Sequence, residues 1–151
     1  MGGFQDIPPV VKTLLIINVL VWVAQITFKN TSFEETLALR YAGNPEFGVW
    51  QLVSYMFLHS TQSFFHILFN MFGLWMFGST LENIWGPKRF LMFYLICGVA
   101  AGLVQLLALH VDMMILENKL TSGAISEAQF QLQGARVYWT STVGASGAIM
   151  G

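Results

Sequence analysis

Two polar side chains lie inside an apolar stretch of this sequence, where their burial is costly and therefore informative. His66 and Asn70 are four residues apart, so on a helix they share one face, one turn from each other. One interpretation is structural, because intramembrane histidine and asparagine side chains often hydrogen-bond neighbouring helices. The other is chemical. Two donors on one face can stabilise the oxyanion that forms during acyl transfer.

A serine between small residues is the second feature that could carry chemistry. In Gly144-Ala145-Ser146-Gly147 the glycines allow close backbone approach, and the start of a helix favours a developing negative charge. The segment is not the G-x-S-x-G elbow of α/β-hydrolases, because position 148 is alanine. The pair Gly147 and Gly151 also fits a helix-packing seam. Taken alone, the tetrapeptide is a weak signal.

The composition indicates which elements must position these residues. Hydrophobic residues make up 55% of the 151 residues and charged residues only 10%. A soluble domain carries roughly 25% charged residues, so this chain is predicted to be a membrane protein. The net charge of −1 argues against nucleic-acid binding. A single cysteine, Cys97, excludes an internal disulfide framework and a cysteine-cluster metal site, and the sequence implies neither a metal nor an organic cofactor.

The long stretches without charge predict membrane-spanning helices. About 20 apolar residues are needed to cross roughly 30 Å of hydrocarbon. The expected spans cover about residues 10–28, 64–81 and 90–109, and a fourth begins at 143–151. The fold class is therefore an all-α membrane protein, with three complete transmembrane helices and the start of a fourth in one domain over residues 1–151.

The segments between the spans predict the orientation. Lys12, Lys88 and Arg89 are the denser group of positive charges, which places their side in the cytoplasm and both long loops outside. In the first long loop, residues 49–58 are expected to form an interfacial or re-entrant segment. The second, residues 110–140, is expected to be a polar outer loop, either an external helix or a mobile segment, and its role is not readable.

Taken together, the motifs are specific, and the chain resembles the rhomboid family of intramembrane serine proteases. The resemblance runs from about Val49 to Gly151, interrupted by the 110–140 loop. The residues that carry it are Trp50, Phe57-Leu58-His59, His66-Ile67-Leu68-Phe69-Asn70-Met71, Gly78-Ser79-Thr80-Leu81-Glu82, Gly86, Arg89-Phe90-Leu91, Tyr94-Leu95, Gly98, Ala101-Gly102 and Gly144-Ala145-Ser146-Gly147. The implied fold is a rhomboid-like helical bundle.

The resemblance implies a role for each matching site residue. Ser146 corresponds to the nucleophile, and its own N–H with the side chains of His66 and Asn70 corresponds to the oxyanion hole. Trp50 belongs to an outer loop that lies partly in the bilayer. Glu82 corresponds to an acidic residue at the cytoplasmic end of the second span, where the expected role is a structural cap.

Further expectations follow from the family. Gly144 and Gly147 are family-structural residues around the nucleophile. The implied partners are the lipid bilayer and transmembrane protein substrates, which are cut near the membrane surface. The implied location is a bacterial inner membrane, and the sequence does not indicate an oligomeric state. Two positions depart from the family pattern: Gln51 replaces a common arginine, and the seven-residue spacing from His59 to His66 is longer than expected.

The largest departure concerns the general base. The family's base is a histidine on a later span, in a G-x-x-x-A-H pattern that these 151 residues do not contain. His59 and His110 are expected to be an interfacial and a solvated histidine rather than substitutes. We therefore expect this polypeptide alone to be inactive and truncated within the fourth span. Two alternatives remain: an inactive rhomboid-like protein that binds transmembrane clients, and a fragment of a small transporter or channel.

Overall fold

The computed structural model describes residues 7–29, 31–61 and 63–144 as a helical protein with three long apolar helices. In chain order its elements are α1 (Pro9–Thr27), α2 (Phe33–Leu37), β1 (Leu39–Arg40), α3 (Gln51–Ser54), η2 (Tyr55–Phe57), α4 (Phe64–Gly73), η3 (Leu74–Gly78), α5 (Ser79–Trp85), α6 (Pro87–Thr121), α7 (Glu127–Trp139) and β2 (Ser141–Thr142). The predicted all-α membrane fold is confirmed.

Three continuous helical stretches are long and apolar enough to cross a membrane. They are Pro9–Thr27, Phe64–Trp85 and Pro87–Thr121. The second and third contain the predicted spans 64–81 and 90–109, and the first ends one residue before the predicted end of span 10–28. Between 17% and 22% of the residues in their apolar windows are buried within the described chain. Most of their apolar side chains therefore face outward, which suits contact with lipid or with further membrane helices.

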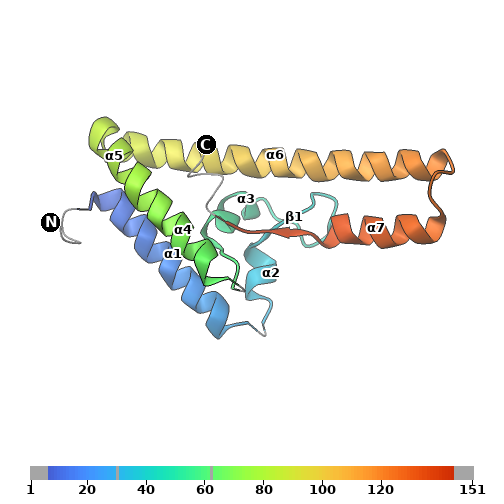
Figure 1. Ribbon diagram of the computed structural model, residues 1–151, viewed down its shortest axis with the longest axis horizontal. Helices are drawn as coiled ribbons and strands as arrows, with labels where there is room; N and C mark the ends of the chain where they lie inside the picture. The colour runs from blue at the N-terminus through green and yellow to red at the C-terminus, as the bar shows by residue number, and fades with distance from the viewer. Residues whose placement is uncertain (1–6, 30, 62, 145–151) are drawn as a thin grey trace.

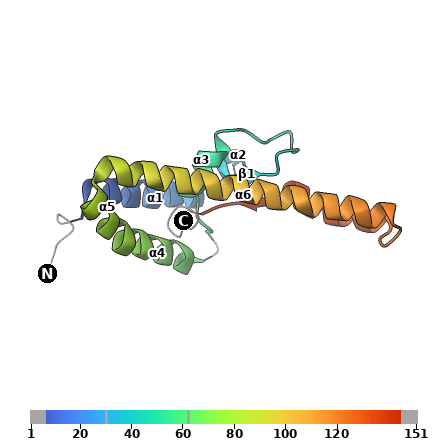
Figure 2. The ribbon, with the colours of Figure 1, turned by 90° about the horizontal axis from the view of Figure 1, so that it is seen from above.

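The second stretch combines α4, η3 and α5. Its middle part, η3, is a π-helical turn, in which the backbone hydrogen bonds widen by one residue. It ends at Trp85, four residues beyond the predicted end of the span, because Gly86 at φ +82° and Pro87 stop the helix there. In Figure 1, α1 lies beside α4 and α5, and the long helix α6 begins beside α5 and diverges from α1 and α4 along its length. Figure 2 shows the same helices from above.

The predicted outer loop 110–140 is largely a helical hairpin. At about 1.5 Å per residue, the 35 residues of α6 extend about 50 Å, well beyond the roughly 30 Å of a hydrocarbon core. The helix continues past residue 109 because the polar residues that follow are compatible with helix. The helix ends at Thr121, two residues before Gly123 (φ +73°), and the N–H of Ala124 donates to the carbonyl of Lys119 at 2.9 Å.

A capping box begins the second helix of the hairpin. The hydroxyl of Ser126 accepts from the N–H of Gln129, and the Gln129 side chain accepts from the N–H of Ser126. Helix α7 then runs back along α6, as Figure 1 shows. The S-x-x-Q pattern was visible in the sequence. These start and stop signals indicate a helix, whereas the polarity of the segment alone does not.

The region between the helices is where the two long loops meet. Strands β1 and β2 pair antiparallel, with Leu39 opposite Thr142 and Arg40 opposite Ser141. The expected interfacial segment 49–58 forms the short helices α3 and η2, which pack on α6. The first loop also packs beside the apolar part of α6, where the hydroxyl of Tyr55 donates to the carbonyl of Gly98. The buried core runs through this junction and includes Leu39, Tyr55 and Met56.

Candidate active site

The two candidate oxyanion donors lie near the start of α4, on consecutive turns. Asn70 is buried, and none of the described residues accepts a hydrogen bond from its Nδ2. The ring of His66 is half-buried, and its Nδ1 accepts a hydrogen bond from the backbone N–H of Ser60 at 3.2 Å. Helix α4 therefore carries one donor group, Nδ2 of Asn70, that has no acceptor among the described residues. It also carries the imidazole of His66, whose orientation the preceding loop restrains.

The loop before α4 is anchored around His59. This residue is fully buried, its ring packs edge-on against the ring of His66 with centroids 5.7 Å apart, and its Nδ1 lies 3.2 Å from the carbonyl of Phe57. Burial is the main cause that lowers the pKa of His59 from 6.5 to about 4; the hydrogen bond to the Phe57 carbonyl opposes this shift, and the nearby His66 adds a smaller lowering effect. His59 is therefore a neutral, packed residue at pH 7 in the loop before α4.

Gln25 near the end of α1 holds the same loop. Its Oε1 accepts from the N–H of His59 and its Nε2 donates to the carbonyl of His59, both at 2.9 Å. In the sequence, Gln25 is a single polar residue within an apolar span, and its connection to the site is not readable there. The signal was a glutamine in an apolar span, but its partner lies 34 residues away in the chain and has no local pattern.

The segment that leads to Ser146 is held against the outer loop. Beyond the β1–β2 pairing, the N–H of Gly144 donates to the carbonyl of Tyr55 at 3.0 Å. The same carbonyl accepts from the N–H of Leu58 at 3.2 Å. Gly144 is the last described residue before the candidate nucleophile. Ser146 and Gly147 lie outside the described residues.

The remaining candidate residues have structural surroundings. Trp50 is 55% exposed at the start of α3, and its Nε1 donates to the carbonyl of Thr36. Gln51 is fully buried, so it does not lie where an exposed arginine would meet lipid headgroups. Its side chain donates to the carbonyl of Glu46 and accepts from the N–H of Arg40.

Glu82 lies at the other end of the molecule, far along the α4–α5 helix from His66. Its side chain is buried, and its two carboxylate oxygens accept from the N–H groups of Val10 (3.0 Å) and Val11 (2.8 Å). Those groups belong to the first turn of α1, where no intrahelical acceptor exists. The carboxylate thus caps α1 from a different helix.

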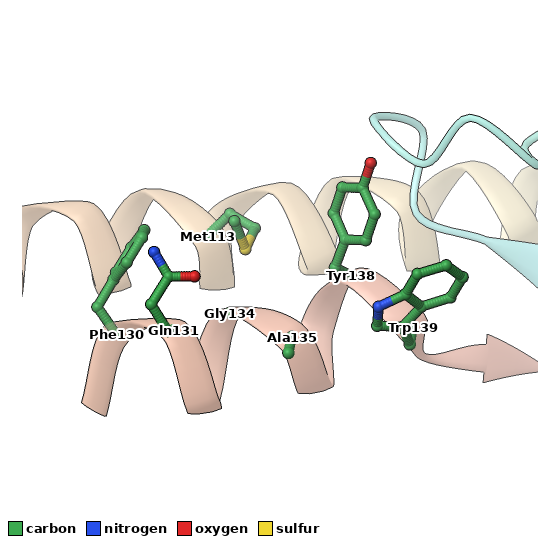
Figure 3. A pocket seen from close by; sticks show the side chains of 7 residues that line it. All are labelled: Met113, Phe130, Gln131, Gly134, Ala135, Tyr138 and Trp139. Atoms are coloured by element: carbon green, nitrogen blue, oxygen red, sulfur yellow. The ribbon is translucent and has the colours of Figure 1, made fainter. Parts of the chain in front are cut away.

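A separate hollow lies between α6 and α7. It has a volume of about 320 Å³ and is lined by Met113 of α6 and by residues of α7 that include Phe130, Tyr138 and Trp139 (Figure 3). None of the candidate site residues lines it. Within residues 7–29, 31–61 and 63–144, no group of three histidine, cysteine or acidic side chains could hold a metal ion.

Comparison with known proteins identifies the family. The Rhomboid domain matches residues 46–151. The chain is 30% identical over 145 residues to Rhomboid protease AarA of Providencia stuartii, covering 92% of this chain and 46% of that protein. It is 25% identical over 94 residues to Rhomboid protease GlpG of Yersinia pestis, covering 62% of this chain and 33% of that protein.

The chain thus spans about half the length of the first of these relatives and a third of the second. The family match extends over more than two thirds of the chain and includes His66, Asn70 and Ser146. It agrees with the three apolar helices that can cross a membrane. This chain therefore belongs to the rhomboid family, and it is an integral membrane protein whose named relatives are proteases.

Proposed function

We propose that this chain carries the nucleophile and the oxyanion hole of an intramembrane serine endopeptidase. The observation that best supports this is the hydrogen bond from the N–H of Gly144 to the carbonyl of Tyr55. The loop that restrains His66 begins three residues after Tyr55 in the chain. Gly144 precedes Ser146 by two residues in the chain, and this hydrogen bond holds Gly144 beside the segment that leads to that loop.

The proposed chemistry begins with attack by the Oγ of Ser146 on the scissile carbonyl carbon. A bond forms between Oγ and that carbon, and the carbonyl oxygen becomes an oxyanion. The N–H of Ser146, the Nε2–H of His66 and the Nδ2–H of Asn70 donate to the oxyanion. Because Asn70 Nδ2 has no acceptor among the described residues, this donor does not have to give up an observed hydrogen bond first.

The hydroxyl proton requires a base, since a neutral serine is a weak nucleophile. Of the three described histidines, His66 is assigned to the oxyanion, His59 is packed and its backbone is held by Gln25, and His110 is exposed on α6. We assign the base to a histidine outside these 151 residues, on a later span. The protonated base then gives its proton to the scissile nitrogen as the C–N bond breaks and the amine leaves, and water, activated by the same base, hydrolyses the acyl-enzyme.

The substrates in this proposal are transmembrane proteins cut near the outer membrane surface. In this proposal the substrate is cut toward the side that the distribution of Lys12, Lys88 and Arg89 predicts to be external. The bacterial relatives support a location in a bacterial inner membrane.

The test is serine labelling in the complete gene product, reconstituted in lipid. A fluorophosphonate probe should label the wild type, and Ser146→Ala should abolish both labelling and cleavage of a transmembrane reporter. Ser141→Ala, in exposed β2, is the matched control and should retain both. His66→Ala and Asn70→Ala should each lower kcat by about 10²–10³-fold. Labelling that persists in Ser146→Ala, or a folded wild type that neither labels nor cleaves, would contradict the proposal.

A further inference from the structure

The side-chain carboxamide of Gln25 makes three hydrogen bonds. Its Oε1 accepts one hydrogen bond from His59, and its two Nε2 hydrogens have two acceptors, the carbonyl of His59 at 2.9 Å and Oε2 of Glu34 at 3.1 Å. Gln25 is only 2% exposed. A side-chain amide that contacts the N–H and the C=O of one residue restrains the orientation of its backbone as well as its position.

The carbonyl of His59 and the N–H of Ser60 belong to the same peptide group. Gln25 donates to the oxygen of this group, and the nitrogen of the group donates to Nδ1 of His66 at 3.2 Å. Because a peptide group is planar, restraining its carbonyl also sets the direction of its N–H. Successive hydrogen bonds through one amide also polarise one another. A continuous path therefore runs from α1 to the imidazole of His66.

This path determines which nitrogen of His66 carries the proton. A neutral imidazole has one N–H and one acceptor nitrogen. Since Nδ1 accepts from Ser60, the proton of neutral His66 lies on Nε2. That tautomer offers a donor to an oxyanion. The other tautomer would present a lone pair from Nε2 and repel negative charge.

The neighbouring ring does not compete for this arrangement. Nδ1 of His59 faces the carbonyl of Phe57 at 3.2 Å, and the rings of His59 and His66 meet edge to face. The backbone of His59 thus carries the hydrogen-bond path, while its ring fills space beside His66.

We propose that Gln25 is a positioning residue for catalysis: through the peptide group between His59 and Ser60, it holds His66 in the Nε2–H tautomer that can donate to the oxyanion. This inference rests on the proposed function, because it assumes that His66 stabilises an oxyanion. It adds a residue of the first span to the site, which the motif residues themselves do not include.

The decisive experiment reads the tautomer directly. In the complete protein labelled with ¹⁵N-histidine, the two ring nitrogens of each histidine have distinct shifts when protonated and unprotonated, and His66→Ala assigns the His66 signals. The wild type should show a protonated Nε2 and an unprotonated Nδ1 at neutral pH. Gln25→Met keeps the length of the side chain and removes its hydrogen bonds, and it should convert this pattern into a mixture of tautomers. Gln105→Met, the same change on α6, should leave it unchanged.

Kinetics provide the second measurement. Gln25→Met should lower kcat at least about tenfold and by no more than the roughly 10²–10³-fold caused by loss of one oxyanion donor, with KM nearly unchanged. A wild-type His66 protonated on Nδ1 would overturn the inference, and this measurement needs no variant to fold. An unaltered His66 tautomer in folded Gln25→Met would overturn it as well. If the wild type shows the expected tautomer but neither cleaves nor labels, the proposed protease function fails and the hydrogen-bond path stands.

Discussion

Replacing Glu82 by glutamine tests the capping of α1 by a side chain 71 residues away. The two carboxylate oxygens accept from the N–H groups of Val10 and Val11 at 3.0 and 2.8 Å, at the positive end of the helix dipole. A carboxamide of the same shape has one acceptor oxygen, so one N–H would face the amide NH₂ instead. Loss of one charge-assisted hydrogen bond costs about 1.5–3 kcal/mol, and loss of the charge–dipole interaction adds up to about 2 kcal/mol. We expect Glu82→Gln to lower the free energy of unfolding by about 3 kcal/mol.

The assay is reversible denaturation of the complete protein in mixed micelles, followed by tryptophan fluorescence. The matched control is Glu127→Gln, because Glu127 also lies in the first turn of a helix but is exposed. Its replacement should cost no more than about 1 kcal/mol. Equal losses for the two variants would refute the reasoning, since they would show that burial and the two hydrogen bonds of Glu82 add nothing.

Three other perturbations have defined outcomes. Because burial lowers the pKa of His59 from 6.5 to about 4, the unfolded state binds more protons than the folded state between these pH values. The stabilising contribution of neutral His59 should be fully present above pH 6.5 and should fall by at most about 3 kcal/mol as the pH drops to 4. In thermal-inactivation measurements, His59→Gln should remove this pH dependence. Gly98→Ala places a Cβ into the buried side chain of Met56 and should cost about 1–3 kcal/mol in mixed-micelle denaturation, whereas Gly134→Ala, where a Cβ meets no atom within 4 Å, should be stabilising by up to about 1 kcal/mol. Tyr55→Phe removes the hydrogen bond from the Tyr55 hydroxyl to the carbonyl of Gly98 (2.6 Å) and should cost about 1–2 kcal/mol in the same assay; no loss would show that this buried bond is not stabilising.

Patterns of neighbouring residues predict the membrane-spanning helices well. The first span was predicted at 10–28 and is helical over Pro9–Thr27. Its boundaries follow from the prolines before it and the polar residues after it. The hairpin of α6 and α7 also has local sequence signals, a glycine after the first helix and a capping box before the second, but its polar composition alone is equally compatible with a loop. Polarity reports where a segment can lie and does not by itself exclude a helix.

The candidate site divides in the same way. The i, i+4 spacing of His66 and Asn70 required only a helix to bring them onto one face, and the structure provides it. The roles of Ser146 and Gly147 remain predictions, because both residues lie outside the described part of the chain. The contribution of Gln25 was not readable, because a lone glutamine in an apolar span is compatible with any polar partner within reach.

By itself, the sequence determined that this is a helical membrane protein of the rhomboid family, because apolar length and short motifs are properties of contiguous residues. Only the tertiary structure decided which distant groups meet. Glu82 caps α1, β2 pairs with β1, and Gln25 clamps the peptide group that orients His66. The physical reason is that such hydrogen bonds depend on the relative placement and rotation of whole helices. That placement is set by the packing of many side chains at once, and no single segment of the sequence encodes it.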